Sequence, residues 1–122
     1  MNGQNMTMSF QVFWNWLVLH PNCILRGGTP DAVLYDDDDL HWHFGEYEEV
    51  MVVQVMRGKR VLGEVFLDPE RVTYVQEIPP ETEEEHMFEL ILENEGDRFP
   101  AYIFVMVHGY DEVPEEGRRR VH

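Results

Sequence analysis

Two histidines followed by a glutamate form the pattern with the most specific chemistry in this sequence. His41 and His43 are two residues apart in the alternating segment Leu-His-Trp-His-Phe, and Glu48 follows after four intervening residues. Residues two apart in a β-strand point to the same face, so both imidazoles can reach one cation. Two imidazoles and a carboxylate suit Zn²⁺, Fe²⁺, Mn²⁺ or Ni²⁺. The pattern therefore predicts a transition-metal site. The alternative is a solvated strand edge that carries two histidines.

The same three residues resemble the first cupin motif, in which H-x-H is followed after three or four residues by E. The resemblance covers residues 41–58 and implies a metal held by His41, His43 and Glu48 inside a small β-barrel. The sequence departs from the family in two respects. Gly58 comes later than the usual motif glycine, and the second motif, with its proline, glycine and third histidine, is absent. Cupin-like metal binding is therefore an alternative function for this chain.

Serine, cysteine and phosphate-binding patterns do not support an enzyme. The only serine, Ser9, stands where a helix is expected to begin, and the only cysteine, Cys23, has His20 near it in sequence but no basic cluster around it. Single cysteines of this kind are most often buried structural residues. Neither G-x-x-x-x-G-K-[ST] nor G-x-G-x-x-G occurs, so no standard nucleotide loop is predicted. We expect a non-enzymatic protein without a cofactor, unless the histidine site takes a transition metal.

The charge of the chain limits its partners. It carries 24 Asp and Glu residues against 9 Lys and Arg, for a formal net charge of -15. A field of that sign repels nucleic-acid phosphates and anionic membranes and attracts basic proteins. Residues 27–56 and residues 76–97 are rich in acids and contain no Lys or Arg. The acidic runs within them are the candidate partner-binding residues: Asp36, Asp37, Asp38, Asp39, Glu83, Glu84 and Glu85.

These charges favour a small protein-binding or regulatory module that contacts a basic protein partner through acidic surfaces. Another alternative, a nucleic-acid mimic, requires carboxylates spaced like phosphates along one ridge. A single cysteine cannot form an internal disulfide, and residues 1–8 lack the positive charge of a signal peptide. The most apolar run, residues 10–19, is shorter than the roughly 20 residues that a membrane helix needs. We therefore expect a cytoplasmic protein that does not contact membranes.

The first element expected to position these residues is a helix over residues 9–19. Ser9 can cap its start, and Pro21 ends it. Four apolar residues recur at helical spacing and make one stripe: Phe10, Phe13, Trp14 and Leu17. The glycine- and proline-bearing segment 26–30 is predicted to be a loop between this helix and the strands that follow.

Alternation and turn signals predict that the rest of the chain is mostly β-structure. A hairpin turns at Gly58-Lys59, and residues 99–108 are apolar on both faces, which indicates a central strand. We predict an α+β domain over residues 1–112, with one N-terminal helix packed on a five- or six-stranded, mostly antiparallel sheet, and a flexible tail over residues 113–122. A small β-barrel or roll is the alternative. A homodimer would cover the sheet surface that one helix leaves bare.

Overall fold

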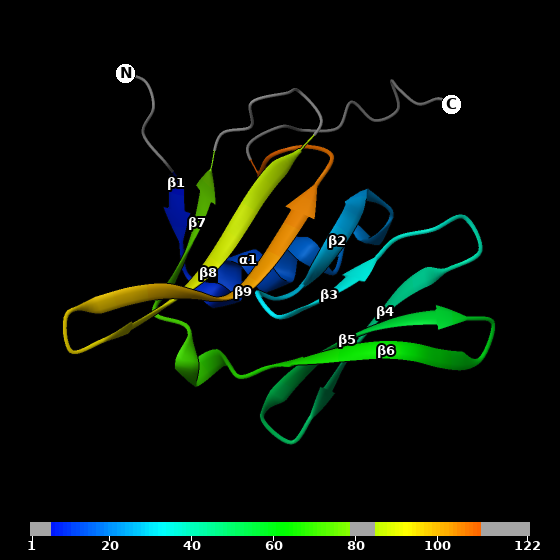
Figure 1. Cartoon of the computed structure of the whole chain (residues 1–122), viewed down its shortest axis with the longest axis horizontal. Helices are drawn as coiled ribbons and strands as arrows, with labels where there is room; N and C mark the ends of the chain where they lie inside the picture. The colour runs from blue at the N-terminus through cyan, green and yellow to red at the C-terminus, as the bar shows by residue number, and fades with distance from the viewer. Residues whose placement is uncertain (1–5, 79–84, 111–122) are drawn as a thin grey trace.

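The computed structural model describes residues 6–78 and 85–110. Within them one α-helix and two antiparallel sheets form a mixed α+β fold (Figure 1). The elements are, in chain order, β1 (Met6–Met8), α1 (Phe10–Leu17), η1 (Pro21–Cys23), β2 (Ile24–Thr29), β3 (Ala32–Tyr35), β4 (His41–Tyr47), β5 (Val50–Arg57), β6 (Arg60–Leu67), η2 (Pro69–Arg71), β7 (Tyr74–Ile78), β8 (His86–Asn94) and β9 (Asp97–Met106).

The helix α1 confirms the predicted cap and apolar stripe. The Ser9 hydroxyl accepts a hydrogen bond from Val12 N at 3.2 Å. The four stripe residues, Phe10, Phe13, Trp14 and Leu17, are all buried. The helix ends at Leu17, two residues earlier than predicted. Bonds of the tighter i to i+3 type, including His20 N to Leu17 O at 2.9 Å, complete the last turn before Pro21.

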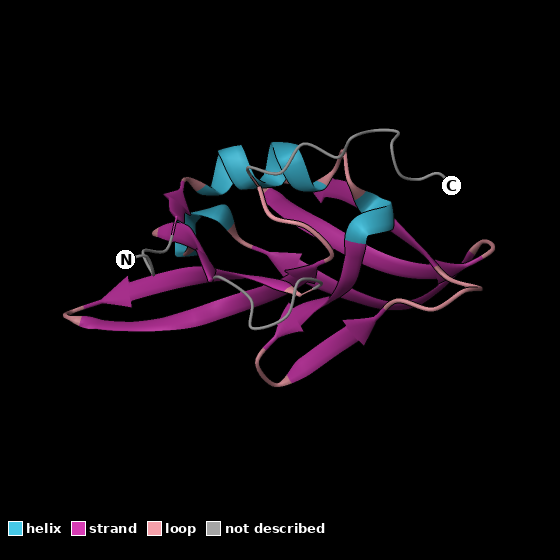
Figure 2. Ribbon diagram, turned by 90° about the horizontal axis from the view of Figure 1, so that it is seen from above, coloured by secondary structure: helices cyan, strands magenta, loops and turns pink. Residues whose placement is uncertain are grey.

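The larger sheet has six strands in the order β1-β7-β8-β9-β2-β3, and every neighbouring pair is antiparallel. The helix lies along one side of the strands (Figure 2). On this inner face, Phe13 contacts Phe88 of β8 and Phe104 of β9, with ring centroids 5.2 and 5.8 Å apart. Strand β9 lies between β8 and β2, as its apolar sequence predicts. The predicted helix on a six-stranded antiparallel sheet is therefore confirmed.

The second sheet, of three strands in the order β4-β5-β6, was not foreseen as a separate layer. Its predicted β5–β6 hairpin is confirmed, and Gly58 has φ 60 in the turn. The sheet packs beside the helix, where Phe44 of β4 meets Trp14. It also reaches β3, because a Cβ added at Gly63 of β6 would lie only 2.6 Å from Leu34 Cδ2. The second sheet therefore packs against part of the helix and the larger sheet within the chain, and the homodimer stays an untested prediction.

Two expectations about the strands need correction. The closed-barrel alternative is wrong, because the strands form two separate sheets that do not close into one barrel. The predicted loop at residues 26–30 is also wrong, since Gly27 lies inside β2 and pairs with Phe104. A Cβ at Gly27 would lie 2.5 Å from Phe104 Cδ2, so glycine here permits close packing under an aromatic ring, whereas the sequence suggested a turn.

The remaining expectations fall partly outside the described residues. The predicted tail, residues 113–122, lies wholly outside them. No helix in the described part of the chain is long and apolar enough to cross a membrane.

Candidate functional site

The outward-facing side of the three-stranded sheet carries a polar row across all three strands. His43, Gln54 and Glu64 lie opposite one another in the β4-β5-β6 register. His43 Nδ1 donates to Gln54 Oε1 at 3.3 Å, and Gln54 Nε2 donates to Glu64 Oε1 at 2.9 Å. Because an amide oxygen only accepts, His43 Nδ1 carries the proton and its Nε2 is left as an acceptor. The row therefore holds the Gln54 amide in one orientation and the Glu64 carboxylate beside it.

Next to this row is a hollow of about 330 Å³. Its centre is the pair Gly45 and Val52, and Phe66 continues that row on β6. Nothing lies within 4 Å of the position that a Cβ would take at Gly45. The absence of a side chain at this position therefore leaves space at the bottom of the hollow. Two aromatic rings are exposed at the hollow, Tyr47 at 65% and Phe66 at 48%. The lining is His43, Gly45, Glu46, Tyr47, Val52, Gln54, Glu64 and Phe66.

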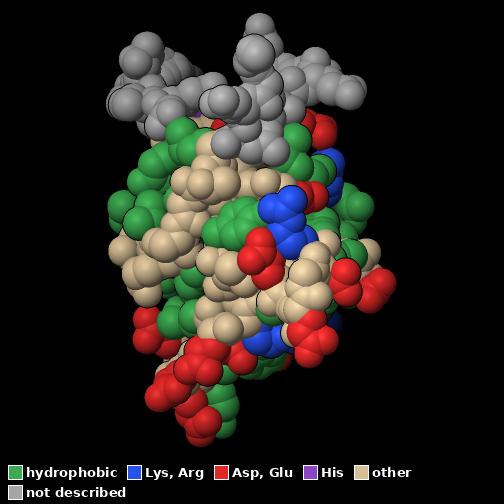
Figure 3. Space-filling view, turned by 90° about the vertical axis from the view of Figure 1, so that its left-hand side faces the viewer, with side chains coloured by type: hydrophobic (Ala, Val, Ile, Leu, Met, Phe, Trp, Pro, Cys, Tyr) green, Lys and Arg blue, Asp and Glu red, His purple; other side chains and the backbone are tan. Residues whose placement is uncertain are grey.

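The hollow lies toward the acidic end of the sheet. Glu46 and Glu64 line it, and among the described residues neither forms an ion pair with Lys or Arg. The β4–β5 turn beyond Tyr47 adds Glu48 and Glu49. Acidic side chains gather at the lower end of the molecule in Figure 3, where this turn lies in Figure 1. The bases of the β5–β6 turn, Arg57, Lys59 and Arg60, are at the opposite end of the strands.

The three predicted metal ligands do not come together. His41 and His43 share one face of β4, as the alternation predicts, and both are exposed. Glu48 lies beyond the other end of this strand, five residues from His43, which is about 16 Å of extended chain. Within residues 6–78 and 85–110, no group of three or more His, Cys, Asp or Glu is arranged to hold a metal ion. His43 instead belongs to the polar row beside the hollow.

The candidate partner-binding acids lie in separate places. Asp36, Asp37, Asp38 and Asp39 form the connection between β3 and β4. Asp36 Oδ1 accepts from Trp42 Nε1 at 3.2 Å, and Asp37 Oδ1 accepts from Asp38 N at 2.7 Å. Glu85 pairs with Arg26 at 3.2 Å. Glu83 and Glu84 lie outside the described residues. Several of these acids therefore stabilise local structure, whether or not a partner also contacts them.

A thiol and an imidazole that are far apart in the sequence meet where β2 and β9 pair. His108 Nε2 lies 3.1 Å from Cys23 Sγ. The backbone brings them together, because Val107 N donates to Cys23 O at 2.9 Å. Sequence reasoning considered Cys23 beside His20 and missed His108. The register of two strands distant in sequence decides this contact, and no local pattern reports it.

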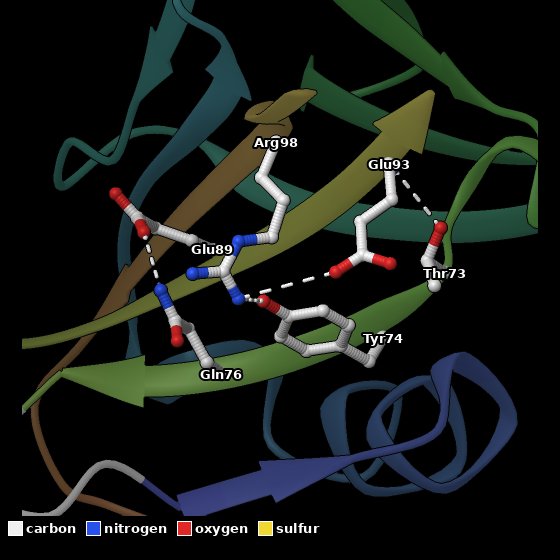
Figure 4. Close-up of polar contacts among 6 residues, drawn as sticks. All are labelled: Thr73, Tyr74, Gln76, Glu89, Glu93 and Arg98. Carbon is white, nitrogen blue, oxygen red and sulfur yellow. Dashed lines mark hydrogen bonds and ion pairs between the residues drawn. The ribbon is translucent and has the colours of Figure 1, made fainter. Parts of the chain in front are cut away.

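A second polar cluster lies across β7, β8 and β9 (Figure 4). Arg98 Nη1 donates to the Tyr74 hydroxyl at 2.8 Å and lies 3.9 Å from Glu93 Oε2. Gln76 Nε2 donates to Glu89 Oε1 at 3.0 Å. Arg98 is 63% exposed, and these are cross-strand pairs of the kind that stabilise sheets by a few tenths of a kcal/mol, up to about 1 kcal/mol each. We infer that this cluster stabilises the pairing of these strands and is not a binding site.

The fold and the hollow together define a small acidic α+β protein with an aromatic, carboxylate-lined surface site. Comparison of the chain with protein families, with curated proteins and with solved structures found no match.

Proposed function

We propose that this chain is a protein-binding module that docks a lysine or arginine side chain of a basic partner protein in the hollow on the three-stranded sheet. The observation that carries the proposal is the pairing of exposed Tyr47 and Phe66 with the carboxylate of Glu64 around one hollow, which Glu46 also lines. Cations are attracted both to aromatic faces and to carboxylates. The net charge of -15 extends the attraction to longer range and speeds the approach of a basic partner.

The expected binding is weak for one side chain and stronger for a basic segment. A cation on an exposed aromatic face contributes about 0.5–1 kcal/mol, and an exposed ion pair contributes about the same or less. Glu48 and Glu49 lie next to the hollow and add attraction for neighbouring basic residues of the partner. The interaction is therefore expected to be fast, reversible and sensitive to salt, as regulatory contacts often are.

The proposal is tested by fluorescence anisotropy with a labelled peptide rich in Lys and Arg. A matched peptide with Gln at the basic positions is the neutral probe, and both are measured at about 20 mM and about 500 mM NaCl, where screening differs strongly. We expect binding of the basic peptide alone, with at least about a tenfold loss of affinity at the higher salt. Equal binding of both peptides, or none of the basic peptide at low salt, would contradict the proposal.

Two variants of equal net charge separate the hollow from the general field of the protein. Glu64→Gln removes a carboxylate that lines the hollow, whereas Glu95→Gln removes one in the β8–β9 turn. Both change the net charge by one unit, so long-range attraction falls equally. We expect the first variant to weaken binding several-fold more than the second. Equal losses would mean that the peptide binds to the charged surface in general.

A further inference from the structure

Cys23 and His108 have the arrangement of a nucleophile and its base. The sulfur and His108 Nε2 are 3.1 Å apart, and both side chains are half-buried. His108 Nδ1 lies 3.0 Å from Gly109 O. Because a carbonyl oxygen only accepts, Nδ1 carries the proton, and Nε2 of the neutral ring presents its lone pair to the thiol. A nucleophile, a base and a third group that orients the base are the parts that activate a thiol.

The chain segment that follows His108 is anchored by a carboxylate of strand β7. Tyr110 N donates to Glu77 Oε1 at 3.2 Å, and Glu77 Oε2 lies 3.4 Å from His86 Nδ1. A Cβ added at Gly109 would overlap Glu77 Oε2 and lie 3.1 Å from His86 Nδ1. A larger residue at position 109 would therefore displace the Glu77 carboxylate or the chain segment beside it. The position of the imidazole is thus fixed by β7 and β8 as well as by its own strand.

Aromatic and imidazole rings pack around the pair of Cys23 and His108. Trp16 meets the His108 ring edge to face at 5.6 Å and the Tyr110 ring at 5.5 Å. His20 lies 5.2 Å from His108, ring to ring, and its Nδ1 donates to Trp16 O at 2.7 Å. Among residues 6–78 and 85–110, the titratable groups that these contacts place near His108 are Cys23, His20, Tyr110 and, through Gly109, the Glu77 and His86 pair.

We propose that Cys23, with His108 as its base, is a site of thiol–disulfide exchange with small neutral or cationic disulfides. His108 Nε2 takes the thiol proton, the Cys23 sulfur attacks one sulfur of R–S–S–R, and the S–S bond breaks. The products are Cys23–S–S–R and R–SH, whose proton comes from His108. The two electrons that Cys23 gives up reduce the departing sulfur, so no other oxidant or reductant is needed.

The composition of the chain decides the kind of disulfide. Cys23 is the only cysteine, so no second thiol of the chain can displace R, and the mixed disulfide is the stable product. A net charge of -15 repels anionic disulfides and favours neutral or cationic ones. The site lies at the junction of β2 and β9, on a different sheet from the hollow proposed for the basic partner. It therefore does not depend on that proposal.

The test measures the rate at which the full chain reacts with 4,4′-dithiodipyridine at about pH 7. We expect one thiopyridone per chain, a mixed disulfide mapped to Cys23 by mass spectrometry, and a rate at least about tenfold above that of the same protein in denaturant. Cys23→Ser abolishes the reaction, and His108→Gln lowers its rate at least about tenfold, whereas Glu95→Gln, in the β8–β9 turn, leaves it unchanged. A native rate no faster than the denatured rate, or an undiminished rate in His108→Gln, would overturn the proposal.

A measurement on the unaltered chain guards against a His108→Gln variant that fails to fold. The ratio of native to denatured rates is taken at about pH 6 and about pH 9, because a free thiol is mostly protonated at the first pH and mostly ionised at the second. A base that ionises the thiol gives a ratio that is larger at pH 6. A ratio at or below one at both pH values refutes the proposal. Cystamine, a cationic disulfide, should react faster relative to oxidised glutathione in the native than in the denatured protein.

Discussion

Trp14 and Phe44 meet edge to face, with ring centroids 5.7 Å apart and ring planes at 87°. Trp14 belongs to the helix that covers the six-stranded sheet, and Phe44 belongs to the three-stranded sheet. The pair therefore joins the sheet that carries the hollow to the rest of the core. Because of this contact, the position of the hollow depends on how the helix packs against both sheets.

Phe44→Ala should destabilise the protein by about 2–4 kcal/mol, through lost burial, a cavity and the lost ring contact. Urea unfolding followed by tryptophan fluorescence measures the change. Phe99→Ala is the matched control, because Phe99 is 45% exposed, and it should cost less than about 1 kcal/mol. Equal losses in the two variants would mean that the three-stranded sheet does not dock through Phe44.

Asp36→Ala should cost about 1–3 kcal/mol, because it leaves the indole N–H of the buried Trp42 without its carboxylate acceptor. Asp39→Ala, in the same connection and with the same change of charge, should stay within about 0.5 kcal/mol. Thermal unfolding at one ionic strength compares the two. If both variants are equally stable, the hydrogen bond between Trp42 and Asp36 does not stabilise the fold, and the four aspartates contribute only negative charge.

Gly45→Leu should fill the hollow without unfolding the protein. A side chain at this position meets no atom within 4 Å of its Cβ, and a glycine inside a strand costs about 0.5–1 kcal/mol relative to Ala. We therefore expect an unchanged or higher Tm together with a loss of basic-peptide binding of at least about tenfold. Retained binding would place the peptide elsewhere.

Gly27→Ala is the contrasting variant, since its Cβ would lie 2.5 Å from the ring of the fully buried Phe104. Overpacking of this kind costs about 1–3 kcal/mol. A lowered Tm with intact peptide binding at low temperature is expected. A stable Gly27→Ala variant would mean that β2 and β9 can separate without penalty.

Gly109→Ala should weaken both the fold and the reactivity of Cys23. The added methyl overlaps Glu77 Oε2, so the carboxylate that accepts from Tyr110 N or the segment that carries His108 must shift. The rate of reaction with 4,4′-dithiodipyridine should fall several-fold at a temperature where circular dichroism shows a folded protein. An unchanged rate would mean that His108 does not need this anchor.

Local patterns were sufficient for much of the secondary structure. Ser9, the apolar stripe of α1 and Pro21 predicted the first helix, and Gly58 predicted the hairpin turn. The alternation around Trp42 correctly placed His41 and His43 together on one face of their strand. These features depend on neighbouring residues and on one periodicity, which a single sequence contains. Gly27 was misassigned because its close packing against Phe104 involves a strand far away in the chain.

The sequence by itself determined the charge, the single thiol, the helix and the antiparallel character of the strands, because composition and short-range periodicity express these directly. Only the tertiary structure decided that the strands divide into two sheets. It also decided that Gly45 lies in a hollow with Tyr47 and Phe66, and that Cys23 contacts His108. Those outcomes depend on register and on packing between distant segments. Many pairings of the same strands satisfy the same local pattern, and only the packing of the whole core selects among them.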